Sequence, residues 1–292
     1  MLRDLSPVNL DVDGVIITAL SAGESTAGKP LIVALHGGTY TARYFDVDGS
    51  GRGSFMDVVA AGGYRVVSFD RPGYGGSSAL VPAENTFARH AELLASAIVQ
   101  LAGDSPVVLV GHSIGGMIAL MIAGAKPAFR LIGASVTGMG AAIRRGGAAE
   151  ALAALPPDET IDLPYDQRDM VMFGPAGSFT ADGVEQAHRS YAPTPVRELI
   201  AAPQWATDIL PGLAPRVDVP VHNALAEFDA LWDSTPENVA QFAKLLTSSP
   251  FVDASIARGV GHSIDHHVLG HALHLRQLAF VEECTWLAGG AR

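Results

Sequence analysis

The stretch that decides the fold is Val107-Val108-Leu109-Val110-Gly111-His112-Ser113-Ile114-Gly115-Gly116, followed by Met117-Ile118-Ala119-Leu120-Met121-Ile122. The first four residues predict a short buried strand, and the last six predict a helix. A Gly-x-Ser-x-Gly sequence is weak evidence by itself, but between a strand and a helix it indicates a sharp turn that exposes a strained serine above the sheet. Flanking glycines suit that turn because they lack a Cβ atom to clash with passing backbone. We therefore predict that Ser113 is a nucleophile.

Two other interpretations of this stretch remain open. Ser113 would only cap the helix if the glycines closed an ordinary strand-to-helix turn. Residues 107–125 also carry no formal charge and have the length of a transmembrane helix. The glycine-rich centre favours a strand, a turn and a helix over a membrane span.

Short apolar segments of β type alternate with helical patterns on both sides of this stretch. Nearly all their residues are apolar, which is typical of strands buried on both faces of a parallel sheet. The intervening helices would form the crossovers, so the sequence predicts an α/β fold with helices on both faces. The expected strands are 8–20 (a hairpin), 31–35, 64–69, 107–110, 131–136, 219–226 and 251–257, and the expected helices are 54–61, 84–101, 114–125, 237–246 and 267–287.

The alternating pattern is interrupted after Gly138 by a stretch rich in alanine and proline, whose prolines should break any long element. We predict a core of residues 1–138 and 215–292, with residues 139–214 inserted as a cap after the sixth strand. Such an insertion leaves the sheet where ligands of α/β proteins bind, so we expect a mobile lid that governs selectivity more than chemistry. Its large side chains would line a pocket or form the cap's own core: Tyr165, Met170, Met172, Phe173, Phe179, Tyr191 and Trp205.

A base and an acid are needed because a serine hydroxyl is a poor nucleophile until a base removes its proton. The strand ending near Ala226 leads into a turn with Asp229, and a later glycine loop holds His262. The order Ser, Asp, His is expected for this kind of fold. Glu227 is the rival acid, because it still lies next to the strand. His112 should pack at the sheet edge, since neighbouring strand residues point to opposite faces.

The chain resembles the α/β-hydrolase superfamily from about Leu31 to the last helix, and more specifically its esterase and thioesterase branch with a serine nucleophile. His36-Gly37-Gly38 is similar to the family's oxyanion loop, and residues 70–77, Asp-Arg-Pro-Gly-Tyr-Gly-Gly-Ser, to its Asp-x-x-Gly-x-Gly-x-Ser turn. The resemblance implies Ser113, His262 and Asp229 as the catalytic residues. It leaves the insertion unmatched.

The same resemblance implies that the backbone N–H groups of Gly38 and Ile114 hold the oxyanion, and donors aimed at developing charge are a large catalytic term. Thr39 and Tyr40 follow this loop, and with Phe173 and Trp205 of the insertion they are our candidates for substrate contact. The main functional hypothesis is hydrolysis of a carboxylic ester, thioester or lactone of a small molecule through an acyl-enzyme, without a cofactor. The alternatives are hydrolysis of a C–C bond or perhydrolysis by the same residues, and a ligand-binding protein without catalysis.

Composition narrows the possible partners and sites. A formal net charge of −11 without a long basic run argues against nucleic acid. The first residues show no secretory signal, so we expect a cytoplasmic protein that does not act at a membrane. Oligomeric state is left open by the sequence. The single cysteine, Cys284, lies in an apolar stretch and excludes a disulfide framework; we expect a buried, inert thiol.

Histidines crowd the C-terminal region: His262, His266, His267, His271 and His274. Spacings of four residues would put pairs of them on one helix face, so a zinc site is conceivable. No His-Glu-x-x-His sequence accompanies them, and an exposed start of the last helix explains most of these residues without a metal. We therefore expect no metal site here, with His262 in the glycine loop and the others at the surface or beside the site.

Overall fold

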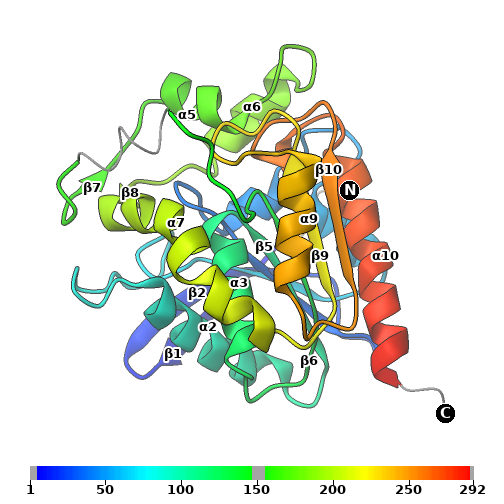
Figure 1. The fold of residues 1–292 in the computed structure, drawn as a ribbon. Coiled ribbons are helices and arrows are strands. Elements are labelled where there is room, and N and C mark those ends of the chain that lie inside the picture. The colour runs from blue at the N-terminus through cyan, green and yellow to red at the C-terminus, as the bar shows by residue number, and fades with distance from the viewer. Residues whose placement is uncertain (1–4, 147–154, 290–292) are drawn as a thin grey trace.

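The structure is a computed structural model that describes residues 5–146 and 155–289 (Figure 1). An eight-stranded sheet with the order β1-β2-β4-β3-β5-β6-β9-β10 forms its centre. Strands β4 to β10 of that order run parallel to one another, while β1 and β2 form an antiparallel hairpin at one edge. The strands are β1 (Ser6–Val12), β2 (Val15–Ala22), β3 (Leu31–Leu35), β4 (Val66–Phe69), β5 (Val107–His112), β6 (Leu131–Thr137), β9 (Val221–Ala226) and β10 (Val252–Ala257).

Strand β5 shows why the sheet is covered on both faces. Val107 and Leu109 belong to one hydrophobic cluster, whereas Val108 and Val110 belong to another. Helices α2 (Phe87–Ala102), α3 (Ile114–Gly124) and α9 (Pro236–Leu245) bury their apolar sides in the first cluster, and α1 (Phe55–Ala61) and α10 (Gly270–Gly289) in the second. The predicted α/β class and mostly parallel sheet are confirmed.

Helix boundaries follow local capping more closely than the sequence pattern alone indicates. Helix α1 starts at Phe55 because Ser54 and Asp57 form a capping box. Helix α2 begins at Phe87, after the Thr86 hydroxyl caps the N–H of Arg89, and not at the predicted residue 84. Helix α10 begins at Gly270, because a short 3-10 turn, Ile264–His266, precedes it.

The alternative of a membrane span at residues 107–125 is wrong. These residues form β5, a turn and α3 in the middle of the molecule. Within residues 5–146 and 155–289, every helix is too short or too polar to cross a membrane.

The segment between β6 and β9 adds a second, smaller group of elements. They are β7 (Thr160–Ile161), α5 (Tyr165–Met172), α6 (Ala181–His188), β8 (Thr194–Pro195), α7 (Val196–Asp208), α8 (Leu210–Leu213) and the 3-10 turn Ala214–Arg216. Figure 1 shows α5 and α6 at the top of the view and β7 and β8 at its left. The expectation that proline breaks every long element here is wrong at Pro203, which lies inside α7. Pro203 has no backbone N–H to donate within the helix, so α7 lacks one hydrogen bond. The burial of Val196 and Trp205 against the rest of the molecule stabilises the helix despite this loss.

Candidate active site

Ser113 lies on the turn between β5 and α3, in a conformation that few side chains adopt. Its φ is 53° and its ψ is −122°. A Cβ atom at Gly111 would come within 2.5 Å of the Gly115 carbonyl oxygen, and one at Gly115 within 2.0 Å of the Leu35 carbonyl oxygen. The turn therefore needs glycine at both positions, and the strained backbone is held by its packing against β3.

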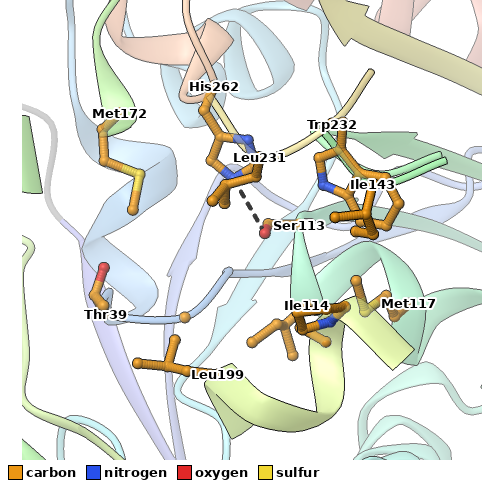
Figure 2. Close-up of a pocket in the computed structure, with 13 residues that line it drawn as sticks. Thr39, Ser113, Ile114, Met117, Ile143, Met172, Leu199, Leu231, Trp232 and His262 are labelled. Atoms are coloured by element: carbon orange, nitrogen blue, oxygen red, sulfur yellow. Dashed lines mark hydrogen bonds between the residues drawn. The ribbon is translucent and has the colours of Figure 1, made fainter. Parts of the chain in front are cut away.

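Three side chains from different loops meet at this turn. His262 Nε2 lies 3.1 Å from Ser113 Oγ (Figure 2). On the other side of the ring, His262 Nδ1 lies 2.9 Å from Asp229 Oδ2. The carboxylate can only accept, so Nδ1 carries the imidazole proton and Nε2 accepts from the serine hydroxyl. All three residues are buried, which strengthens these bonds relative to bonds in water.

The sheet explains how residues so far apart in sequence come together. Ser113 follows β5, Asp229 follows β9, and His262 lies in the loop after β10. These strands are parallel, so their carboxyl ends meet at one edge, where ligands of α/β proteins bind.

The structure places Asp229, and not Glu227, beside His262. The second oxygen of Asp229 accepts from the backbone N–H groups of Leu231 and Trp232, at 2.8 and 3.0 Å. Glu227 points away and accepts from the N–H of Gly259 at 2.7 Å. The carboxylate of Asp229 thus contacts both the histidine and the loop that follows it.

An apolar cavity of about 70 Å³ opens beside Ser113 (Figure 2). Gly38 and Ile114, the predicted oxyanion residues, line it together with Thr39. Thr39 has a positive φ of 65°, and its buried Oγ1 has no hydrogen-bond partner among the described residues. The rest of the lining is Met117, Ile143, Met172, Leu199, Ala202, Pro203, Leu231, Trp232 and His262.

Three of the four residues predicted to contact substrate lie elsewhere. Tyr40 is fully buried, and its hydroxyl bonds to Ser263 at 2.8 Å. Phe173 packs on the rings of Phe179 and His267. Trp205 borders a different hollow, on the other side of α7.

Sequence reasoning misplaces these residues because aromatic character alone does not show which face of an element meets the cavity. The lining residues that it misses are on α3, after β6, on α7 and in the loop after Asp229. Leu231-Trp232, an apolar pair two and three residues beyond the predicted acid, is the one available signal.

The other histidines near the C-terminus are expected at the surface or beside the site; the surface is wrong for three of them, and His271 is half-buried. His266, His267 and His274 are buried, and each has a hydrogen-bond partner in the fold. Burial lowers the pKa of both His266 and His267 to about 4, so both rings are neutral at ordinary pH. In residues 5–146 and 155–289, no cluster of three histidine, cysteine or acidic residues is arranged to hold a metal.

His112 packs behind the site, as predicted. Its ring stacks on Tyr44 with centroids 4.4 Å apart and lies 4.9 Å from the ring of His262. Burial and the neighbouring His262 hold the pKa of His112 well below its usual range. Cys284 is buried too, and burial raises the pKa of its thiol to about 12, which fits an inert thiol.

The inserted segment is bonded to the predicted oxyanion loop. The N–H of Thr41 donates to Ser190 O at 2.9 Å, and the N–H of Ala192 donates to Thr39 O at 2.8 Å. A mobile lid that governs selectivity more than chemistry stays a prediction, and these bonds link the segment directly to the loop beside Ser113. Moving the segment away would disturb the loop beside Ser113.

Comparisons with known proteins agree with this architecture. Residues 32–283 match the model of the alpha/beta hydrolase family. No curated protein matches the chain. A thermophilic esterase from Thermogutta terrifontis superposes with a TM-score of 0.69 at 18% identity, covering 96% of this chain and 99% of that chain.

Two further solved structures have a similar fold. The thioesterase domain from the curacin biosynthetic pathway gives a TM-score of 0.67 at 18% identity, covering 94% of this chain and all (100%) of the other. A mutant of the N-acyl homoserine lactonase AidH, complexed with N-hexanoyl homoserine, gives a TM-score of 0.71 at 15% identity, covering 97% of this chain and 98% of that chain. Since the family match spans most of the sequence and the sheet has the family's topology, the chain belongs to the alpha/beta hydrolase family, and its enzyme class is that of the hydrolases.

Proposed function

We propose that the protein cleaves a carboxylic ester, thioester or lactone with a small, apolar acyl part, through an acyl-enzyme on Ser113. The observation that carries this proposal is the hydrogen-bonded series Asp229, His262 and Ser113, which ends at an apolar cavity. A binding protein without catalysis has no need for a base and an acid bonded in this order.

The reaction begins when Ser113 Oγ attacks the carbonyl carbon and passes its proton to His262 Nε2. Negative charge then develops on the carbonyl oxygen, beside Gly38 and Ile114, whose backbone N–H groups would donate to it. His262 gives the proton to the leaving alcohol or thiol, and the acyl group stays on Ser113. Water, activated by the same histidine, releases the acid in the second half of the reaction.

Asp229 assists both halves of this reaction through His262. As long as its Oδ2 accepts from Nδ1, the free nitrogen of the ring is the one that faces Ser113. The carboxylate also stabilises the imidazolium that forms when the serine proton arrives.

The cavity supports the choice of an apolar acyl group. Apart from His262 and Ser113, the lining side chains carry no charged group, and their polar groups are the Thr39 hydroxyl and the Trp232 indole N–H. A carboxylate or ammonium group on the acyl chain would lose its hydration there without gaining an oppositely charged partner. The volume of about 70 Å³ favours a short chain.

The test is covalent labelling by an alkyl fluorophosphonate, followed by peptide mass spectrometry. We expect one label per chain on Ser113 and none on the Ser113→Ala variant. A panel of p-nitrophenyl esters, acyl thioesters and lactones, run on both proteins, then ranks the leaving groups. A folded wild-type protein that takes no label and cleaves no member of the panel would refute the proposal.

A further inference from the structure

An ion pair lies in the interior where the inserted segment meets the oxyanion loop. Arg71 Nη1 and Glu198 Oε2 are 2.8 Å apart, and their side chains are 0% and 1% exposed. Arg71 follows β4 in the core, and Glu198 lies in the first turn of α7. Taking both charges out of water costs much of what their attraction gains, so such a pair contributes little net stability. The groups that it contacts indicate another role.

The guanidinium of Arg71 bonds to the loop that precedes Thr39. Its Nε donates to His36 O and its Nη2 donates to Gly37 O, both at 3.0 Å. The backbone N–H of Arg71 donates to His36 Nε2, also at 3.0 Å. His36 Nδ1 must then carry the ring proton, and it donates to the same Gly37 oxygen at 2.8 Å.

Two donors, one of them charged, therefore hold the carbonyl of Gly37. Burial and the nearby guanidinium keep the pKa of His36 well below its usual range, so its ring stays neutral and keeps this tautomer. The Gly37–Gly38 peptide bond is trans, so the N–H of Gly38 is directed opposite to the carbonyl that is held. Gly38 itself lines the cavity beside Ser113.

The carboxylate end of the ion pair reaches the same loop by a second route. Glu198 Oε2 also accepts from the Tyr74 hydroxyl at 3.1 Å. Tyr74 bonds in turn to the Thr194 hydroxyl, which accepts from the N–H of Thr39 at 3.1 Å. Leu199, the residue after Glu198, forms part of the cavity wall.

We propose that Arg71 and Glu198 are positioning residues that fix the Gly37–Gly38 peptide for oxyanion binding and tie it to helix α7. This inference rests on the proposed function, since it assigns a task to the Gly38 N–H in that reaction. The charged donor also polarises the peptide, which makes the Gly38 N–H a stronger donor. The pair acts on the developing oxyanion more than on the bound substrate.

The variants that test this inference are Arg71→Lys and Glu198→Gln. Lysine keeps the positive charge, but its single ammonium group cannot donate to His36 O, Gly37 O and Glu198 together, as the planar guanidinium of Arg71 does. Glutamine keeps the shape of Glu198 and removes its charge. The matched control is Arg168→Lys. Arg168 is also a buried arginine, but it lies in the inserted segment and its side chain bonds to Asp162.

Each protein is titrated with fluorophosphonate to count active sites, and kcat and KM are measured for one p-nitrophenyl ester. Inhibition is compared between an alkyl trifluoromethyl ketone, which forms an oxyanion on serine, and the matching methyl ketone. For Arg71→Lys we expect kcat per active site to fall about 10²- to 10³-fold, the loss seen when one oxyanion donor is removed. KM and methyl ketone affinity should stay within threefold, while trifluoromethyl ketone affinity falls with kcat.

Glu198→Gln should show the same pattern with a smaller loss of kcat, about tenfold, because the Arg71 guanidinium keeps its bonds to His36 O and Gly37 O. Arg168→Lys should leave kcat per active site unchanged. If Arg71→Lys does not fold, the kcat and the ketone affinities of Glu198→Gln test the inference instead. Unchanged kcat and an unchanged ratio of the two ketone affinities overturn the inference alone, provided that the wild-type protein is labelled. A wild-type protein without labelling overturns the proposed function and the inference with it.

Discussion

Asp229 Oδ2 lies 2.9 Å from His262 Nδ1, while Oδ1 of the same carboxylate accepts from the backbone of Leu231 and Trp232. One side chain therefore orients the imidazole and fixes part of the cavity wall. Because the two contacts use different oxygens, substitutions can separate them. An asparagine keeps a carbonyl oxygen for the backbone but loses the negative charge, whereas an alanine loses both contacts.

The first prediction separates Asp229 from its sequence neighbour. Asp229→Asn should fold normally and lose about 10⁴ in kcat, because the base loses its tautomer and its counter-charge. Glu227→Gln is the control, since that side chain bonds to Gly259 and not to His262. It should stay within a fewfold of the wild type. Steady-state kinetics on one ester checks both, and a reversed ranking would move the orienting acid to Glu227.

The second prediction concerns acyl-chain length. Leu199 and Ile200 are neighbours on α7 and both are half-buried, but Leu199 lines the cavity beside Ser113 and Ile200 lines the hollow beyond the helix. Leu199→Ala should lengthen the preferred acyl chain and raise the ratio of kcat/KM for the longer over the shorter ester about tenfold. Ile200→Ala should leave that ratio unchanged. Equal shifts in both variants would mean that α7 affects selectivity only through its stability.

The third prediction tests the crowded turn at Ser113. A Cβ at Gly115 would lie 2.0 Å from the Leu35 carbonyl oxygen, so Gly115→Ala should cost several kcal/mol of unfolding free energy, about 3 or more. Gly212→Ala is the control, because nothing lies within 4 Å of the added methyl group. It should be neutral or stabilise by up to about 1 kcal/mol. Urea denaturation measures both, and similar losses would contradict the close packing at Gly115.

The fourth prediction is that stability falls in mild acid. Burial lowers the pKa of four histidines, His90, His222, His266 and His267, to about 4. In the unfolded chain a histidine takes up its proton near pH 6.5. Between those values the unfolded state binds more protons than the folded state. The unfolding free energy is therefore unaffected by these groups above about pH 6.5 and decreases as the pH falls from there toward about 4.

His222 gives this prediction a matched pair of variants. His222→Asn should reduce the loss of stability between pH 6.5 and 4.5 by about 2 kcal/mol, since one titrating group is gone. Ser135→Ala removes the hydroxyl that bonds to His222 Nδ1 at 2.8 Å but leaves the imidazole in place. It should retain the wild-type pH dependence. Guanidinium denaturation across this pH range measures the slopes, and an unchanged slope in His222→Asn would rule out its titration on unfolding.

The sequence predicts the sheet and the group around Ser113 because both depend on local patterns and on one rule of topology. The run from Val107 to Ile122 fixes the turn, and parallel strands bring the ends of β9 and β10 to the same edge. Chain order then indicates Asp229 and His262 without any knowledge of distant contacts.

What the sequence does not reveal depends on packing between distant segments. His266 is buried because its Nε2 bonds to Tyr44 O, 222 residues away, and no spacing within the C-terminal region indicates that contact. The pair Arg71 and Glu198 is separated by 127 residues in the same way. The cavity wall on α7 likewise depends on how this helix rotates against the sheet, so sequence reasoning expects Trp205 in the cavity while Leu199 lines it.

The double use of the Asp229 carboxylate limits how such a protein can acquire a new substrate. Residues Leu231 and Trp232 are bonded through their backbone to the oxygen beside the one that holds His262, so a shift of this wall also moves the acid. On α7, Leu199 and Ala202 contribute apolar side chains to the cavity, and neither side chain holds Asp229 or His262 in place. Descendants of one ancestral chain would therefore diverge in substrate range mainly at these two positions, while Glu198 and the loop after β9 keep their ancestral places.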